Sequence, residues 1–136
     1  MPGTGCASLQ KWHVYHVWCA DWIPPHYQYC ICVCTIREWF LFINSEPPQG
    51  RKARAYAITI SNHETHFLKK PESHTPTAPN TFADDRVAKA LENPDNDLGK
   101  LAPFLIGRIK CAVETNPSLT DFQRLVMLSD DPVPLN

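Results

Sequence analysis

The chain contains no apolar run of the length that a transmembrane helix needs, which is about 18 residues, so no membrane-spanning helix is predicted. Residues 1–12 lack the charged and apolar blocks of a signal peptide, which makes the cytoplasm the expected compartment. Only 5 of the 136 residues are glycine, and none stands in a phosphate-loop or nucleophile-elbow pattern. Nucleotide-driven enzymes and serine hydrolases are therefore disfavoured.

An excess of charge of either sign is also lacking, because the net charge is −1 at pH 7. This disfavours a nucleic-acid binder of the histone type, which works through its overall positive charge, but it allows a local basic patch. Hydrophobic residues make up 43% and charged residues 20%, as is typical of a folded domain. At this length we expect a single domain over residues 11–128, with flexible ends at 1–10 and 129–136.

Cysteine is present six times, and Cys30, Cys32 and Cys34 alternate along one apolar run. Neighbours two apart on a strand cannot easily form a disulfide, so we interpret them as free, buried thiols. Sulfur ligation of a metal is the alternative. His63 and His66 could join such a site, but their spacing suits a metal only in a helix. No metal and no other cofactor is predicted.

Strands come first along the chain, and helices follow. The expected strands cover 11–20, 27–35, 39–44 and 55–60, and the expected helices cover 84–93, 98–115 and 119–128. The regular part of the second helix is expected to begin near Pro103, and Ser118 is the expected cap of the third. Residues 61–81 are expected to form a long, mostly irregular loop. This order predicts an α+β fold, in which a strongly bent antiparallel sheet or a small barrel has helices packed on one side or at one end.

The order of short motifs along the chain is informative in its own right. YCICVC is followed by WFLFINSEPP, by HFLKKPESH, and by a helix that ends at NPSLT before a final helix. Over residues 11–128 this order resembles divergent members of the PemK/MazF-like toxin superfamily. The resemblance implies a small SH3-like antiparallel β-barrel followed by two or three C-terminal helices, usually in a homodimer. It also implies metal-independent cleavage of single-stranded RNA in a bacterial or phage toxin–antitoxin system, with an antitoxin protein as partner.

The catalytic pattern of that family is only partly present. The family typically uses an Arg at the start of the second barrel strand and a Thr or Ser at the end of a later strand. Here the second strand begins PPHY around His26, without an Arg, whereas Thr59 and Ser61 match the second requirement. This departure puts catalysis in doubt rather than the fold. The alternative function is a non-catalytic protein- or RNA-binding module on the same barrel.

RNA cleavage without a metal needs a base, an acid and a cation. Histidine can supply the first two, so His26 is a candidate together with His66 or His63, while Thr59 or Ser61 would position the phosphate. The other interpretation of each histidine is a surface residue in a loop. The predicted catalytic residues are His26, Thr59, Ser61 and His66.

Arg51, Lys52 and Arg54 form the densest basic run, and Lys69 and Lys70 follow at a distance. A groove between the two groups would suit a phosphodiester backbone, with aromatic side chains as stacking faces and Arg51 or Arg54 as the catalytic cation. A solvated loop face is the alternative. The predicted substrate-binding residues are Tyr27, Arg51, Lys52, Arg54 and Phe67.

Overall fold

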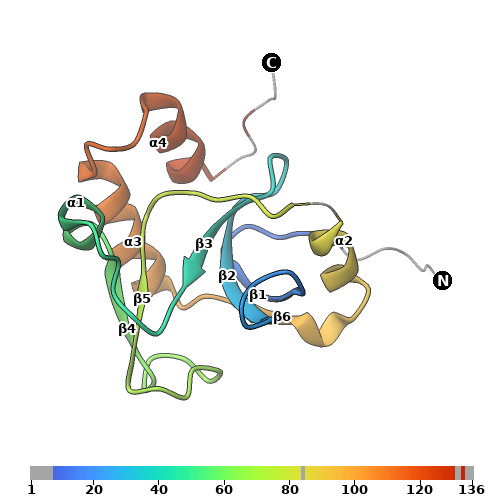
Figure 1. Cartoon of the computed structure of the whole chain (residues 1–136). Coiled ribbons are helices and arrows are strands. Elements are labelled where there is room, and N and C mark those ends of the chain that lie inside the picture. The colour runs from blue at the N-terminus through green and yellow to red at the C-terminus, as the bar shows by residue number, and fades with distance from the viewer. Residues whose placement is uncertain (1–7, 84, 131–132, 134–136) are drawn as a thin grey trace.

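The computed structural model describes residues 8–83, 85–130 and 133 of the chain. The predicted flexible ends therefore lie largely outside the described residues. Within them the fold is α+β, as predicted (Figure 1). None of the described helices is long and apolar enough to span a membrane. The elements are β1 (His13–Cys19), β2 (His26–Cys34), β3 (Trp39–Ile43), α1 (Arg51–Ala55), β4 (Ile58–Ser61), β5 (Glu72–Thr75), α2 (Arg86–Leu91), the 3-10 turn η1 (Pro94–Asn96), β6 (Asp97–Lys100), α3 (Pro103–Thr115) and α4 (Asp121–Leu128).

The strands form a four-stranded antiparallel sheet in the order β3-β2-β1-β6 and a two-stranded sheet of β4 and β5. Two isolated backbone bridges connect β3 and the residue after it to β5 and the segment that follows β5, one between Asn44 and His74 and one between Phe40 and Asn80. In each bridge both residues donate an N–H to the other's carbonyl, at 2.7–2.8 Å. The segment that follows β5 therefore runs beside β3, and the two sheets form one strongly bent, open unit.

The alternation of side chains along β2 determines what each face of the sheet buries. Ile31 and Val33 lie in the larger core, on the side of α3 and α4, whereas Cys30 and Cys32 lie in a smaller core together with Val87 of α2. The sheet is thus covered by helices on both sides (Figure 1). The larger core includes Val14, Ile31, Val33, Leu41, Ile43, Ile58, Ile60, Leu105, Ile109, Val113 and Met127.

The predicted state of the three alternating cysteines is confirmed, because Cys30, Cys32 and Cys34 are free and buried. Burial raises the pKa of the Cys32 thiol to about 12, and it raises the pKa of Cys30 well above its ordinary value. Since only a thiolate is a good nucleophile or metal ligand, these groups are packing residues at neutral pH.

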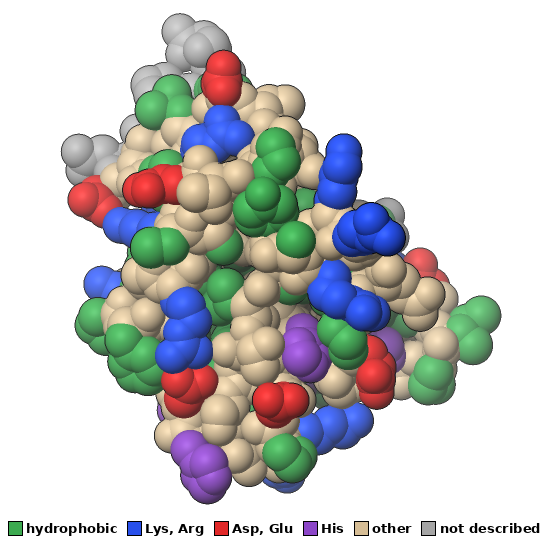
Figure 2. Space-filling view, turned by 90° about the vertical axis from the view of Figure 1, so that its left-hand side faces the viewer, with side chains coloured by type: hydrophobic (Ala, Val, Ile, Leu, Met, Phe, Trp, Pro, Cys, Tyr) green, Lys and Arg blue, Asp and Glu red, His purple; other side chains and the backbone are tan. Residues whose placement is uncertain are grey.

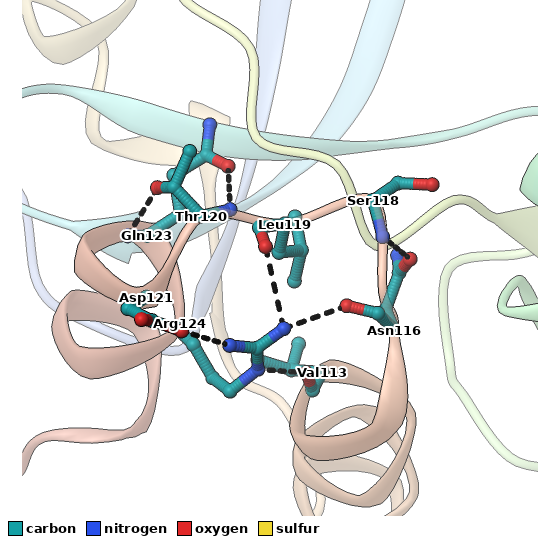
Figure 3. A network of polar contacts seen from close by, with 8 residues as sticks. All are labelled: Val113, Asn116, Ser118, Leu119, Thr120, Asp121, Gln123 and Arg124. Atoms are coloured by element: carbon teal, nitrogen blue, oxygen red, sulfur yellow. Dashed lines mark hydrogen bonds and ion pairs between the residues drawn. The ribbon is translucent and has the colours of Figure 1, made fainter.

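Arg124 holds the junction between α3 and α4 (Figure 3). Its guanidinium donates to the carbonyls of Val113 (3.3 Å), Asn116 (2.8 Å) and Leu119 (3.3 Å), groups at the end of α3 and in the turn that follows it. It also pairs with Asp121 at 3.0 Å. One side chain therefore satisfies carbonyl groups that a helix end leaves without partners inside the helix.

The sequence predicts Ser118 as the cap of the last helix, but the structure assigns this role to Thr120. The Thr120 hydroxyl accepts a bond from the Gln123 N–H at 3.0 Å, and the Gln123 side chain accepts one from the Thr120 N–H at 3.0 Å. This is a capping box, whose Thr-x-x-Gln spacing is present in the sequence. The Ser118 N–H instead donates to the side chain of Asn116.

Other elements also differ from the predicted ones. The expected helix over 98–115 begins only at Pro103, since Gly99 has a φ of +96° and residues 97–100 form β6. The expected loop 61–81 contains β5. Its sequence ESHT did not indicate a strand, because it lacks aliphatic residues. Residues 51–55 form α1, and the fourth strand begins at Ile58 rather than at 55. Strands therefore do not all precede helices.

Candidate nucleic-acid interface

The face of the sheet that α3 and α4 cover extends beyond these helices at one end of β1 and β2. Val14 and Ile31 lie under the helices, but farther along the same strands this face carries rings instead of aliphatic side chains. In the antiparallel register His16 lies opposite Tyr29, and Trp18 lies opposite Tyr27. Trp18 and Tyr27 are 46% and 48% exposed, so this end of the face is open to solvent.

These rings form a continuous series of contacts, which we call the aromatic row. From one end to the other, the centroid distances are 4.9 Å from Trp18 to Tyr27, 4.2 Å to His16, 4.6 Å to Tyr29 and 5.3 Å to Phe67. The first four rings come from β1 and β2, and Phe67 comes from the loop between β4 and β5. The row therefore joins two distant segments of the chain.

The orientation of the rings determines where a ligand can stack. His16 lies between Tyr27 and Tyr29 at interplanar angles of 24° and 14°, so both faces of the imidazole are covered. Burial lowers the pKa of His16, which keeps the ring neutral at physiological pH. Trp18 is tilted by 57° to Tyr27. The ring faces that remain free for a ligand are thus those at the two ends of the row.

The loop that carries Phe67 is held by a polar clamp at its start. The Glu64 carboxylate accepts the N–H of Ser61 at 2.9 Å and pairs with Arg108 of α3 at 2.7 Å. Arg108 also donates to the carbonyl of Thr59 at 3.1 Å. The bond from Arg108 holds the pKa of Glu64 below its usual value, so the clamp is ionised at neutral pH. Phe67 thereby has a defined position against Tyr29.

A pocket of about 400 Å³ lies next to the Phe67 end of the row. We call it the histidine pocket, because His63 and His66 line it together with Lys100 of β6. The ring of His66 makes an edge contact with Phe67 at 5.5 Å. Two imidazoles and one ammonium group therefore share a pocket beside the row.

A second pocket, of about 320 Å³, lies along the middle of the row. Tyr27, Tyr29 and Phe67 line it from the row, and Lys69 and Lys70 line it from the loop. Both lysines are exposed. Cationic groups thus stand directly beside aromatic rings here, as in proteins that bind single-stranded nucleic acid.

The structure does not bring His26 and His66 together. His26 has the same parity on β2 as Gln28 and Cys30, and its ring makes an edge contact with Trp22 at 5.3 Å. Trp22 in turn contacts Phe42, which packs against the smaller core under α2. The Nδ1–H of His26 donates to the carbonyl of Pro24 at 2.7 Å. His26 therefore lies on the face opposite the aromatic row, and it cannot pair with His66 as acid and base.

The predicted phosphate-positioning and basic residues also divide between two places. Ser61 lies in the clamp, but the exposed Thr59 side chain contacts His74 at 3.4 Å on the outer side of β4 and β5. Arg51, Lys52 and Arg54 are exposed on α1, at the opposite end of β4 from the loop (Figure 1). On this side of the molecule, Lys and Arg side chains gather at the height of α1, while a histidine lies at the lower tip (Figure 2).

His16, Trp18 and Lys100 are not among the site residues predicted from the sequence. His16 and Trp18 lie two and four residues after Val14, so all three side chains point to the same face of β1. Tyr27 and Tyr29 lie on the same face of β2 as Ile31 for the same reason. A run of rings that continues an aliphatic core face is a detectable pattern. Lys100 could not be found this way, because β6 was itself unexpected.

Among the described residues no group of three or more His, Cys, Asp or Glu side chains is arranged to hold a metal ion. Comparisons of the chain with family models, curated proteins and solved structures find no match. The resemblance to the PemK/MazF-like superfamily therefore stays a prediction.

Proposed function

We propose that the chain binds single-stranded RNA along the aromatic row. The observation that carries this proposal is the continuous series of rings from Trp18 to Phe67 with two lysines beside it. Stacking of one base on an aromatic side chain contributes about 1–3 kcal/mol and tolerates any base. Lys69, Lys70 and Lys100 supply the local positive charge that the neutral chain as a whole does not have.

The bent sheet supports the finer fold interpretation, in which this module is an open variant of the SH3-like barrel. The bridges at Asn44–His74 and Phe40–Asn80 continue the curvature from β3 into β5, as a barrel wall would. In this proposal the protein is a toxin-like domain that binds cytoplasmic RNA and does not cleave it.

Cleavage of RNA is a second candidate function, because the histidine pocket adjoins the row. His63 and His66 would act as base and acid, and Lys100 would stabilise the charged phosphorane. His26 has no part in this mechanism, since it lies on the other face of the sheet. Ser61 would act only by shaping the turn, where its hydroxyl accepts the N–H of His63 at 3.1 Å.

Binding is tested by fluorescence anisotropy with a labelled oligouridine of about ten nucleotides at low salt. Trp18→Ala is expected to weaken binding by about tenfold, in line with the loss of the exposed stacking ring at one end of the row. Phe122→Ala is the matched control, because Phe122 is also 46% exposed but lies on α4 against Trp39, at the opposite end of the sheet from Trp18. Absence of binding, or equal losses in both variants, would overturn the proposal.

Cleavage is tested by incubating the same RNA with the protein in a chelator and mapping new ends. The double variant His63→Ala/His66→Ala is expected to lose any cleavage but keep binding, and His26→Ala should cut like the wild type. Intact RNA with the wild-type protein would rule out the second candidate and leave the binding function in place.

A further inference from the structure

A third pocket, of about 400 Å³, lies at the Trp18 end of the row, between the β1–β2 turn and α2. We call it the α2 pocket. It shares Trp18 and Tyr27 with the row, so a strand that follows the row reaches this pocket at its end. Its remaining polar lining includes Asp85, Arg86, Lys89 and Asn96.

The α2 pocket has an apolar wall that fits a flat ring. Trp18 contacts its neighbour in the row only at an angle of 57°, and its side chain is 46% exposed. Ala20 and Ala90 also line the pocket, and their side chains are small. A nucleobase can therefore stack on the indole while its edge points at the polar lining.

The charges in the α2 pocket argue against a phosphate as its ligand. Asp21 and Asp85 balance Arg86 and Lys89, so the pocket has no net positive charge. Arg86 is largely buried, with 13% of its side chain exposed, and it is already paired with Asp21. This ion pair ties α2 to the β1–β2 turn, and it gives the pocket a fixed wall rather than a free cation.

Asp85 and Lys89 are the groups that remain available for a ligand. Asp85 is the N-cap residue of α2, yet its carboxylate makes no capping hydrogen bond. It pairs only loosely with Lys89, at 3.7 Å, and both side chains are more than 60% exposed. An exposed carboxylate and an exposed ammonium group, joined only by this long ion pair, thus stand side by side at the rim of a stacking site.

We propose that the α2 pocket binds one base of the RNA and selects guanine; this inference rests on the proposed RNA-binding function. Guanine has two adjacent N–H donors, at N1 and N2, which match the two oxygens of the Asp85 carboxylate. Its O6 and N7 are acceptors that Lys89 can reach. Adenine has an acceptor at N1, which the carboxylate repels, and uracil and cytosine lack the second ring that covers the indole.

The experiment compares labelled ten-nucleotide RNAs that are all uridine except for one central guanosine, inosine or adenosine. Guanosine is expected to raise the affinity about tenfold over oligouridine. Inosine lacks the 2-amino group and should lose most of this gain, and adenosine should add little. Asp85→Asn and Lys89→Met should each remove the preference, so that each variant binds the guanosine RNA and oligouridine with nearly the same affinity.

Asp95→Asn is the matched control, because Asp95 is an exposed carboxylate on η1 that does not line the pocket. Urea unfolding of each variant checks that its fold is intact. If oligouridine binds but guanosine adds nothing, or if the preference survives in Asp85→Asn, the guanine inference is wrong and RNA binding stands. If no RNA binds, both proposals fail together.

Discussion

One face of the β3-β2-β1-β6 sheet has two halves that differ in what covers them. In the covered half, α3 and α4 bury Val14, Ile31 and Leu41 to 1% exposure or less. In the open half the same strands carry His16, Trp18, Tyr27 and Tyr29, and Trp18 and Tyr27 are 46% and 48% exposed. The strands β1 and β2 are continuous across both halves, so backbone pairing does not distinguish them.

The difference lies in how each half satisfies its apolar side chains. Aliphatic side chains gain stability only when other groups remove them from water, which α3 and α4 do in the covered half. Rings can also stack on each other, so a row of rings on an open face is partly self-covering. We therefore expect substitutions in the covered half to change stability, and substitutions in the open half to change binding.

The largest expected effect is that of Leu105→Ala in the covered half. Leu105 is 0% exposed and packs from α3 into the larger core. Its truncation leaves a cavity and should lower the free energy of unfolding by about 2–5 kcal/mol. The shift of the urea unfolding midpoint, with the transition slope unchanged, measures this loss.

Tyr27→Ala tests how much the open half contributes to stability, by urea unfolding under the same conditions. Because Tyr27 is half exposed, we expect a loss of about 1 kcal/mol or less. Losses of equal size in Leu105→Ala and Tyr27→Ala would mean that the open half also holds the fold together.

The next largest loss of stability is expected for Arg124→Met, which tests the junction between α3 and α4. The variant keeps an apolar stem but removes the donors to the carbonyls of Val113, Asn116 and Leu119. We expect a loss of about 1–2 kcal/mol by urea unfolding, because these bonds are partly buried. Asp121→Asn should cost a few tenths of that, since the Asp121 side chain is fully solvated.

Much of this architecture can be predicted from the sequence, because local patterns specify it. The alternation of cysteine with Tyr29, Ile31 and Val33 predicts the two faces of β2 correctly. Pro103 predicts where α3 begins, since proline lacks the N–H that later helical positions need. The short strands β5 and β6 could not be predicted, because long-range pairing rather than composition makes them strands.

The candidate site was predictable only in part. Tyr27 and Phe67 were expected to form stacking faces, and both belong to the aromatic row. The expected pairing of His26 with His66 was wrong, since one residue of shift along a strand moves a side chain to the other face. Arg51 and its neighbours were expected to form a groove with Lys69 and Lys70, but α1 precedes β4 and lies at the opposite end of this strand from the loop that carries the two lysines.

The next prediction concerns His16, the one imidazole in the row. Its folded-state pKa is lowered by burial from an ordinary value of 6.5. Below about pH 6.5 the unfolded chain therefore binds a proton that the folded chain resists, and the protein should lose stability as the pH falls. His16→Phe keeps a ring between Tyr27 and Tyr29, and it should reduce the dependence of the free energy of unfolding on pH in this range. Urea midpoints at about pH 7.5 and about pH 5.5 measure it, and equal slopes in both proteins would contradict it.

The smallest expected effect on stability is that of Arg108→Met, and it concerns the link between the two halves. Arg108 belongs to the helix that covers one half, and its partner Glu64 begins the loop that carries Phe67 into the other. This ion pair is too exposed to contribute much to folding, so the urea midpoint should stay within error of the wild type. Lys110→Met, which removes another cation of α3, is the control.

The same variant should nevertheless weaken RNA binding severalfold, because without the clamp Phe67 must be ordered against Tyr29 at the moment of binding. Trypsin should also cut faster after Lys69, which lies in the released loop. A change in binding without a change in stability would show that the covered half positions the open half. A loss of stability with unchanged affinity would instead mean that the clamp contributes only to folding. The rings of the open half would then hold their positions without it.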